Sequence, residues 1–417
     1  MTTEAEAVRD SPRISDNTFL RVGCLFLHTI HGSLGSFTRV RELSLSAAKH
    51  GVSTFILTPY EHDKTLSDRV QIRGIPNVAL KIGLSHQMYE ISRKVYYSKH
   101  LSKLLNRSAS GAVMDRLAAK VSKMVSVGGI HILQAEQDFS LVAGKKVKQL
   151  TGVPLIADIH NITSEELVAA GIIEKDGKDF RELQRQTAEN LSYADVIVVV
   201  SDLMKEYMIS EYNISRSKLV LVPPGGRLRT KNIAKSPPLN FVYSGLLSYR
   251  ENVELFVKSM PYVVRRFSDA KFFMTRRGEM LSELSKLASS LNVSPNFFWY
   301  ENVTDLYNFL LSCYAGILPS SDDLARRMGT PAKLFEYLSH GLPVVANDIG
   351  GWTDIISRHK VGVLTASEPA QFAEGIARLI DKDREEYAQN ALRLVAERYN
   401  WDNSALTLLD AYNKVVN

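Results

Sequence analysis

Short apolar runs alternate with helical patterns along the first half of the chain. The runs are rich in β-branched and aliphatic residues and span Arg21–Leu27, Thr54–Leu57, Ile130–Leu133, Leu155–Ala157, Val196–Val200 and Leu219–Val222. Between the first two, from about Phe37 to Lys49, apolar residues recur at helical spacing. Such alternation predicts a parallel sheet with helices on both faces.

The second half repeats this pattern with its own set of strands. Apolar runs occur at Phe241–Tyr243, Lys271–Met274, Ala315–Leu318, Pro343–Ala346 and Val361–Leu364. Helices are predicted over about Val253–Phe267 and Pro369–Ile380, the latter with a proline in its first turn. The chain is therefore predicted to be of the α/β class, with two doubly wound domains.

A polar, basic segment that ends in two prolines separates the two series and is interpreted as a linker. The predicted organisation is a flexible N-terminus over 1–18, an N-terminal domain over 19–226, a linker over 227–239, a C-terminal domain over 240–385, and helices over 386–417 that pack back toward the N-terminal domain. In open α/β sheets ligands bind beyond the carboxyl ends of strands, so the cleft between the domains is the expected site.

Composition narrows the class of protein. The 417 residues are 45% hydrophobic and 23% charged, which is typical of a globular protein and not of a disordered or collagen-like chain. The two cysteines, Cys24 and Cys313, each lie in an apolar run, so a disulfide framework is not expected. The N-terminus lacks the apolar stretch of a secretory signal, and no run is long enough to span a bilayer. A cytoplasmic protein is expected.

Basic residues gather in one region of the first half. Residues 51–150 hold 15 basic and 7 acidic residues, with the centre of the charge at 81–124. Five residues of this basic region form a candidate acceptor or membrane surface: Arg93, Lys94, Lys99, Lys103 and Arg107. A solvated helical face, a surface for anionic lipid at the inner face of the membrane, and nucleic-acid binding all stay open, although no nucleic-acid signature supports the last.

Two loops that follow predicted strands carry candidate chemistry. His31–Ser36 contains two glycines before a helix, where backbone N–H groups favour an anion or a sugar hydroxyl. An ordinary strand-to-helix turn is an equal interpretation. The second loop, Ala157–Asn161, lies at the end of an apolar strand. Its His160 could donate a hydrogen bond or move a proton. A structural histidine is the alternative there.

The most informative segment is Gly329–Ala346. Gly329 and Pro331 precede a helix that carries Lys333 and Glu336, and a buried strand follows. Free N–H groups at the helix start suit an anion, and a carboxylate at Glu336 can accept two hydroxyl groups from a ribose diol. A surface ion pair between Lys333 and Glu336 is the alternative.

This segment resembles the donor-site signature of GT-B glycosyltransferases of family 4, the group 1 type. Every letter of the pattern P-x-K-x-x-E-Y-x-x-x-G-x-P-V-V is present from Pro331 to Val345. Residues Val198–Lys205, Leu219–Gly226, Tyr243–Val253 and Val345–Gly351 resemble further segments of that family, in the same order.

The resemblance implies a GT-B fold, with two Rossmann-like domains facing across a cleft. It implies a retaining hexosyltransferase that uses a nucleotide-sugar, a UDP- or GDP-sugar, and passes the sugar to a glycan or lipid-linked acceptor. No metal and no cofactor are expected, because cations and N–H groups stabilise the leaving diphosphate. The implied catalytic residue is His160, and the implied donor-binding residues are Gly35, Ser36, Gly329, Thr330, Lys333 and Glu336. Arg250 is the nearest candidate for the catalytic cation that the family pattern expects, with Arg276, Arg277, Arg326 and Arg327 as further candidates.

Several positions depart from the family pattern. Met328 stands where the family often has another glutamate, Leu246 replaces an arginine, and Glu251 occupies the likely place of a phosphate-binding lysine. Two alternatives therefore stay open beside a transferase active in cell-surface glycan or glycoprotein assembly. One is a degenerate protein that binds sugar nucleotides without transfer, and the other is a GT-B nucleotide-sugar epimerase.

Overall fold

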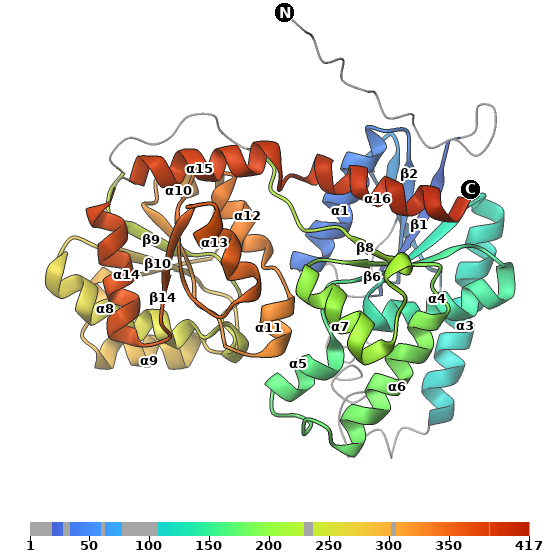
Figure 1. Cartoon of the computed structure of the whole chain (residues 1–417), viewed down its shortest axis with the longest axis horizontal. Helices are drawn as coiled ribbons and strands as arrows, with labels where there is room; N and C mark the ends of the chain where they lie inside the picture. The colour runs from blue at the N-terminus through green and yellow to red at the C-terminus, as the bar shows by residue number, and fades with distance from the viewer. Residues whose placement is uncertain are drawn as a thin grey trace, which may run out of the picture.

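The computed structural model describes residues 19–27, 34–59, 63–76, 107–228, 237–301, 306–382 and 384–416. It forms two α/β domains that lie side by side (Figure 1). Each domain is built on one sheet, and the sheets are formed by the apolar runs seen in the sequence.

The N-terminal sheet has the order β3-β4-β2-β1-β5-β6-β7-β8. Its strands are β1 (Arg21–Leu25), β2 (Ser53–Thr58), β3 (Lys64–Ser67), β4 (Val70–Gly74), β5 (Ile132–Glu136), β6 (Leu155–Ile159), β7 (Val196–Val199) and β8 (Leu219–Leu221). All neighbours are parallel except β3 and β4. The strand order reverses between β1 and β5, which makes the carboxyl ends of these two strands the expected binding edge.

Helices cover both faces of this sheet. They are α1 (Leu34–Ala48), α3 (Arg107–Gly128), α4 (Gln137–Thr151), α5 (Thr163–Ala169), α6 (Lys178–Ser192) and α7 (Asp202–Tyr212), with the 3-10 turn η1 (Arg216–Lys218). Because strand side chains alternate, Leu133 packs in the cluster that includes Val121 of α3, while its neighbour Ile132 packs with Leu43 of α1 on the other face. This arrangement explains why the buried strands are apolar at nearly every position.

The C-terminal sheet has six parallel strands in the order β11-β10-β9-β12-β13-β14. They are β9 (Asn240–Tyr243), β10 (Lys271–Thr275), β11 (Phe297–Tyr300), β12 (Ala315–Leu318), β13 (Val344–Asn347) and β14 (Gly362–Thr365). In sequence order within the domain this is 3-2-1-4-5-6, the Rossmann arrangement. The order reverses between β9 and β12, so this domain also has a defined binding edge.

Helices and 3-10 turns surround the C-terminal sheet. They are η2 (Tyr249–Glu251), α8 (Val253–Arg266), α9 (Leu281–Ser290), η3 (Ser294–Asn296), α10 (Leu306–Leu311), α11 (Leu324–Met328), α12 (Ala332–Leu338), η4 (Gly351–Thr353), α13 (Asp354–Arg358) and α14 (Pro369–Asp381). Phe256 of α8 and Phe372 of α14 pack on one face, and Leu334 and Leu338 of α12 pack on the other.

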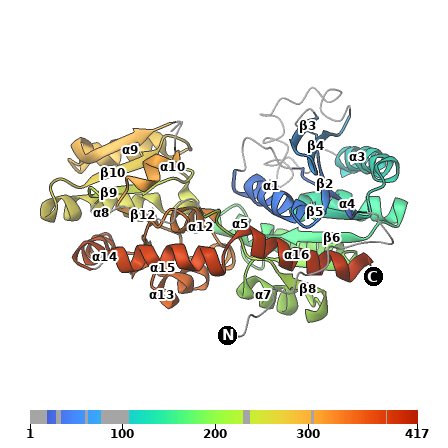
Figure 2. The ribbon, with the colours of Figure 1, turned by 90° about the horizontal axis from the view of Figure 1, so that it is seen from above.

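The last two helices divide between the domains. Helix α15 (Arg384–Glu397) packs on the C-terminal domain, where Ala391 and Val395 join the cluster around α12. Helix α16 (Trp401–Val416) lies across the N-terminal domain beside α1 (Figures 1 and 2), and its Leu408 packs with strand residues there. The chain passes between the domains twice, after β8 and after α15. These two segments lie side by side, because Gly226 forms a β-bridge with Asn400.

The α/β class with two Rossmann-like domains is confirmed. The helices predicted over Val253–Phe267 and Pro369–Ile380 are α8 and α14, within a residue at each end. The antiparallel pair β3–β4 and strand β11 were not predicted, because Lys64–Ser67 is polar and Phe297–Tyr300 is a short aromatic run.

Candidate active site

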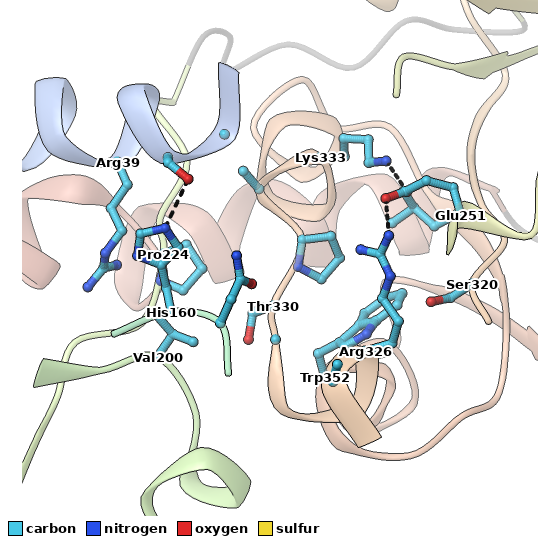
Figure 3. Close-up of a pocket in the computed structure, with 18 of the residues that line it drawn as sticks. Arg39, His160, Val200, Pro224, Glu251, Ser320, Arg326, Thr330, Lys333 and Trp352 are labelled. Carbon is cyan, nitrogen blue, oxygen red and sulfur yellow. Dashed lines mark hydrogen bonds and ion pairs between the residues drawn. The ribbon is translucent and has the colours of Figure 1, made fainter. Parts of the chain in front are cut away.

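A cavity of about 180 Å³ lies between the domains, beyond the carboxyl ends of β1 and β6 in one sheet and of β9 and β12 in the other. Both domains line it (Figure 3). Of the predicted catalytic and donor-binding residues, those that line it are Gly35, Ser36, His160, Arg250, Gly329, Thr330 and Lys333. Seven of the eight predicted catalytic and donor-binding residues therefore share one cavity, although Gly35 and Lys333 lie far apart in the sequence.

His160 projects from the N-terminal wall. It follows β6, whose five residues are all buried, so the strand fixes where the imidazole begins. Its Nε2 lies 3.0 Å from Ser36 Oγ at the start of α1, a distance suited to a hydrogen bond. Its Nδ1 lies 3.9 Å from Asp158 Oδ1. The ring therefore lies between a helix start and a buried carboxylate, and it lines the cavity (Figure 3).

A buried polar network supports His160 from below. Asp158 is fully buried and receives the guanidinium of Arg39, whose Nε lies 3.2 Å from each carboxylate oxygen. Burial opposes ionisation of Asp158, but Arg39 and His160 outweigh it, so the pKa of Asp158 is lowered. Sequence reasoning missed Arg39, which lies 119 positions from Asp158 and is recognisable only as a charge on an otherwise buried helix face.

A second acid, Glu136, ends the neighbouring strand β5. It accepts a hydrogen bond from Gln134 Nε2 at 2.8 Å, and Gln134 accepts one from the hydroxyl of Tyr412 on α16. Burial and the adjacent Asp158 charge raise the pKa of Glu136 well above its ordinary value. The fold thus favours the protonated form of Glu136 and the carboxylate form of Asp158.

Glu136, Asp158 and His160 each offer one ligand atom within 4.8 Å of the others, a spacing that suits a metal ion. However, Arg39 already contacts both oxygens of Asp158. A divalent ion beside this guanidinium would meet a like charge in a buried setting. The cation that this wall supplies to its carboxylates is Arg39.

The C-terminal wall presents two cations around one acid. Glu251 in η2 accepts from Lys333 Nζ and from Arg326 Nη2, each at 2.5 Å (Figure 3). Burial opposes ionisation of Glu251, but Lys333 and Arg326 outweigh it and lower its pKa to about 2. Gly245 makes room for this arrangement, because a Cβ there would lie 2.3 Å from Lys333 Nζ.

Arg250 lines the cavity but points toward the other domain. Its Nη2 donates to Glu166 Oε1 of α5 at 2.7 Å, which forms an ion pair between the domains. Its backbone carbonyl accepts from Ser321 Oγ and from Arg326 Nε. In this structure Arg250 therefore holds the domains together at the edge of the cleft.

The predicted donor segment meets the cavity at its first turn. Gly329 and Thr330 form the link between α11 and α12, and Lys333 is in the first turn of α12. Glu336 lies one turn later, is half-buried, and does not line the cavity. It is close enough to Tyr300 and Tyr337 to raise their pKa values further, after burial, which is the main cause.

Met328 occupies the position of a family glutamate, and it serves as a contact between domains. It is fully buried and joins the core cluster of the N-terminal domain. Its carbonyl accepts from Ser201 Oγ at 2.6 Å, at the start of α7. The methionine therefore stabilises the packing of α11 on the N-terminal domain.

Most of the predicted acceptor or membrane surface lies outside the described residues. This applies to Arg93, Lys94, Lys99 and Lys103, and Arg107 is described only as the first residue of α3. Within the described part of the chain, no helix is long and apolar enough to cross a bilayer.

Comparisons with known proteins identify the relatives of both domains. Residues 227–393 match the family described as Glycosyl transferases group 1, and residues 33–227 match Glycosyltransferase Family 4. The uncharacterized glycosyltransferase MJ1607 of Methanocaldococcus jannaschii is 23% identical over 71% of this chain and 79% of its own. The D-inositol 3-phosphate glycosyltransferase of Paenarthrobacter aurescens is 22% identical over 90% of this chain and 92% of its own.

Solved structures show the same fold at low sequence identity. Sucrose-phosphate synthase from Thermosynechococcus elongatus has a TM-score of 0.72 at 14% identity, covering 95% of this chain and 98% of that one. The Anabaena protein HepE, in complex with UDP and glucose, has a TM-score of 0.69 at 14% identity, covering 94% of this chain and 99% of that one. The two-domain architecture is therefore shared along almost the whole chain.

Proposed function

This chain belongs to the group 1 glycosyltransferases of the GT-B fold, and we propose that it moves a hexosyl group from a UDP- or GDP-sugar to a glycan or lipid-linked acceptor. The observation that carries this proposal is the pair of unlike walls in one cleft. The C-terminal wall offers Lys333 and Arg326 to an anionic leaving group, and the N-terminal wall offers His160 to the reacting sugar.

The proposed reaction needs stabilisation of charge that develops on the leaving diphosphate. Preorganised cations supply this in a water-poor site, and they do so without a metal. We therefore propose a metal-independent transfer that needs no cofactor. Retention of anomeric configuration follows the family resemblance. The complex of HepE with UDP and glucose supports a nucleotide-sugar as the donor class.

The acceptor and the place of action complete the proposal. A lipid-linked or glycan acceptor in cell-surface glycan or glycoprotein assembly would bind mainly the N-terminal domain. The basic residues around 81–124 are proposed to contact anionic lipid at the inner face of the membrane, with the protein in the cytoplasm. Liposomes that contain anionic lipid should then bind the protein at low salt, and neutral liposomes should not.

A degenerate protein that binds sugar nucleotides without transfer is the second candidate. Two observations favour it: Met328 is buried in the N-terminal core, and Glu251 neutralises cations in the cleft. One experiment in two steps distinguishes the transferase from the degenerate binding protein. A thermal-shift panel of UDP, GDP and their sugar conjugates first identifies the donor, since a ligand that binds the native state raises Tm.

Turnover with the selected donor then decides between them. Release of the nucleotide in the presence of acceptor, with the product anomer followed by NMR, supports the transferase. A clear Tm shift with no turnover on any acceptor supports the degenerate protein. Glu336→Gln should weaken donor binding with the fold intact, and unchanged affinity would break the assignment of this residue to the ribose.

A further inference from the structure

Glu251 is an acid at the centre of a cation cluster in the proposed donor site. Its side chain is 17% exposed and lines the cleft beside Arg326 and Lys333, which are 24% and 18% exposed. The hydroxyl of Tyr243 lies 3.2 Å from Glu251 Oε2 and donates to the carbonyl of Leu246 at 2.8 Å. The carboxylate thus holds the place that an anionic ligand would take between the two cations.

The turn that carries Glu251 is fixed on three sides. Ser321 Oγ donates to the carbonyl of Arg250 at 2.9 Å, and Arg326 Nε donates to the same carbonyl at 3.1 Å. Asn252 Nδ2 donates to the carbonyl of Ser320 at 3.3 Å. The residues on either side of Glu251 are therefore tied to the segment after β12, which positions the turn that carries the carboxylate.

The charge of Glu251 persists at every pH at which the protein would work. Its pKa is lowered to about 2, against the effect of burial, by Lys333 and Arg326. A phosphate group that approaches either cation must therefore share it with a fixed carboxylate and is repelled by that carboxylate at short range.

We propose that Glu251 is a specificity-determining residue of the donor site, which weakens the hold on phosphate groups and favours release of the nucleoside diphosphate product. This inference rests on the nucleotide-sugar transfer proposed above. An intact nucleotide-sugar carries about two phosphate charges, and the free nucleoside diphosphate carries nearly three, since a terminal phosphate loses its second proton near pH ~6. Glu251 therefore disfavours the product more than the donor.

The test compares wild type with Glu251→Gln, which keeps the shape and removes the charge. Calorimetric titrations use UDP, inorganic pyrophosphate and uridine. The variant should bind UDP and pyrophosphate about tenfold more tightly, because both cations are released to the ligand. Uridine, which has no phosphate, should bind both proteins equally. Pyrophosphate keeps the test valid if the donor carries a base other than uracil.

Controls separate the charge of this one position from other effects. Glu254→Gln removes an exposed acid on α8 that pairs with Lys258 outside the cleft, and it should leave all affinities unchanged. If Glu251→Gln fails to fold, Glu251→Ala with the same ligands replaces it. Equal or weaker binding of UDP and pyrophosphate by a folded Glu251 variant overturns this inference and leaves the donor site in place. Binding of neither ligand by wild type or variant overturns the proposed function as well.

Discussion

The two walls of the cleft both pair carboxylates with cations, but with opposite balance. On the N-terminal wall two acids, Glu136 and Asp158, meet Arg39, and none of the three side chains is more than 5% exposed. On the C-terminal wall two cations meet Glu251, and all three are partly exposed. Glu136 and Asp158 do not line the cavity and can act only on the groups that they hold, whereas Arg39 and the three C-terminal charges line it and can also reach a ligand.

This difference assigns a distinct task to each wall. The N-terminal network surrounds the base of His160, which lines the cavity, and the C-terminal cluster is the part that we propose to bind the leaving group. The domains are joined across the cleft by Arg250 and Glu166 and by the contact of Ser201 with Met328. Similar ion pairs in one cleft thus differ in what they can contact, according to their burial.

The largest effect is expected from Lys333→Gln. It leaves Arg326 neutralised by Glu251, so the C-terminal wall loses its excess positive charge. Affinity for the donor should fall on the order of a hundredfold, in line with the loss of a charged partner for phosphate. Calorimetry measures it. Lys258→Gln, which removes a lysine from an exposed ion pair, is the matched control and should have no effect. An equal loss in both variants would contradict the assignment.

A large effect on stability is expected from Asp158→Asn. The substitution leaves the buried guanidinium of Arg39 without its carboxylate, and removal of one partner of a buried pair costs about 3 kcal/mol. Urea unfolding gives the free energy. Asp402→Asn, in an exposed pair with Lys49, should cost less than about 1 kcal/mol. If the two variants are equally stable, the N-terminal network does not stiffen the wall.

Glu136→Gln tests the raised pKa of Glu136 through the pH dependence of the free energy of unfolding. Unfolded Glu136 ionises near its ordinary value of 4.5, whereas the folded protein keeps the proton to higher pH. The folded state then binds more protons in this interval, so this residue lowers stability as pH rises through it. The variant should match the stability of wild type at about pH 4 and be more stable than wild type at about pH 8. Equal pH profiles would mean that Glu136 is ionised in the fold.

The smallest effect is expected for the ion pair between domains. Arg250 and Glu166 are 34% and 25% exposed, so a double-mutant cycle of Arg250→Gln and Glu166→Gln should give a coupling below about 1 kcal/mol. The kcat values of the two single variants distinguish two roles of Arg250. If Arg250 also acts on the donor, Arg250→Gln lowers kcat and Glu166→Gln does not. Equal changes in kcat would restrict Arg250 to joining the domains.

The sequence predicted the parts of the site that follow local rules. The apolar strand before His160 and the signature from Pro331 to Val345 are both continuous in the chain, so position and role could be inferred together. The charged partners of the site residues could not be predicted from the sequence. Arg326 lies 75 positions from Glu251, and Arg39 lies 119 from Asp158, so only the folded chain shows which charges meet.

Met328 illustrates the same limit. The sequence indicated a departure from the family pattern at this position, but its place in the core of the other domain depends on how α11 packs against α7. In the same way Glu251 was recognised as an acid where a cation was expected, and its partners on α11 and α12 became visible only in the structure.

We propose that the C-terminal wall binds the donor and that the N-terminal wall takes part in the reaction. One measurement tests it most directly: donor affinity and nucleotide release by wild type and His160→Ala, with the donor chosen by the thermal-shift panel. We expect the dissociation constant to change by less than about threefold and kcat to fall by about a hundredfold or more. An unchanged kcat, or an equal loss of affinity and kcat, would contradict it.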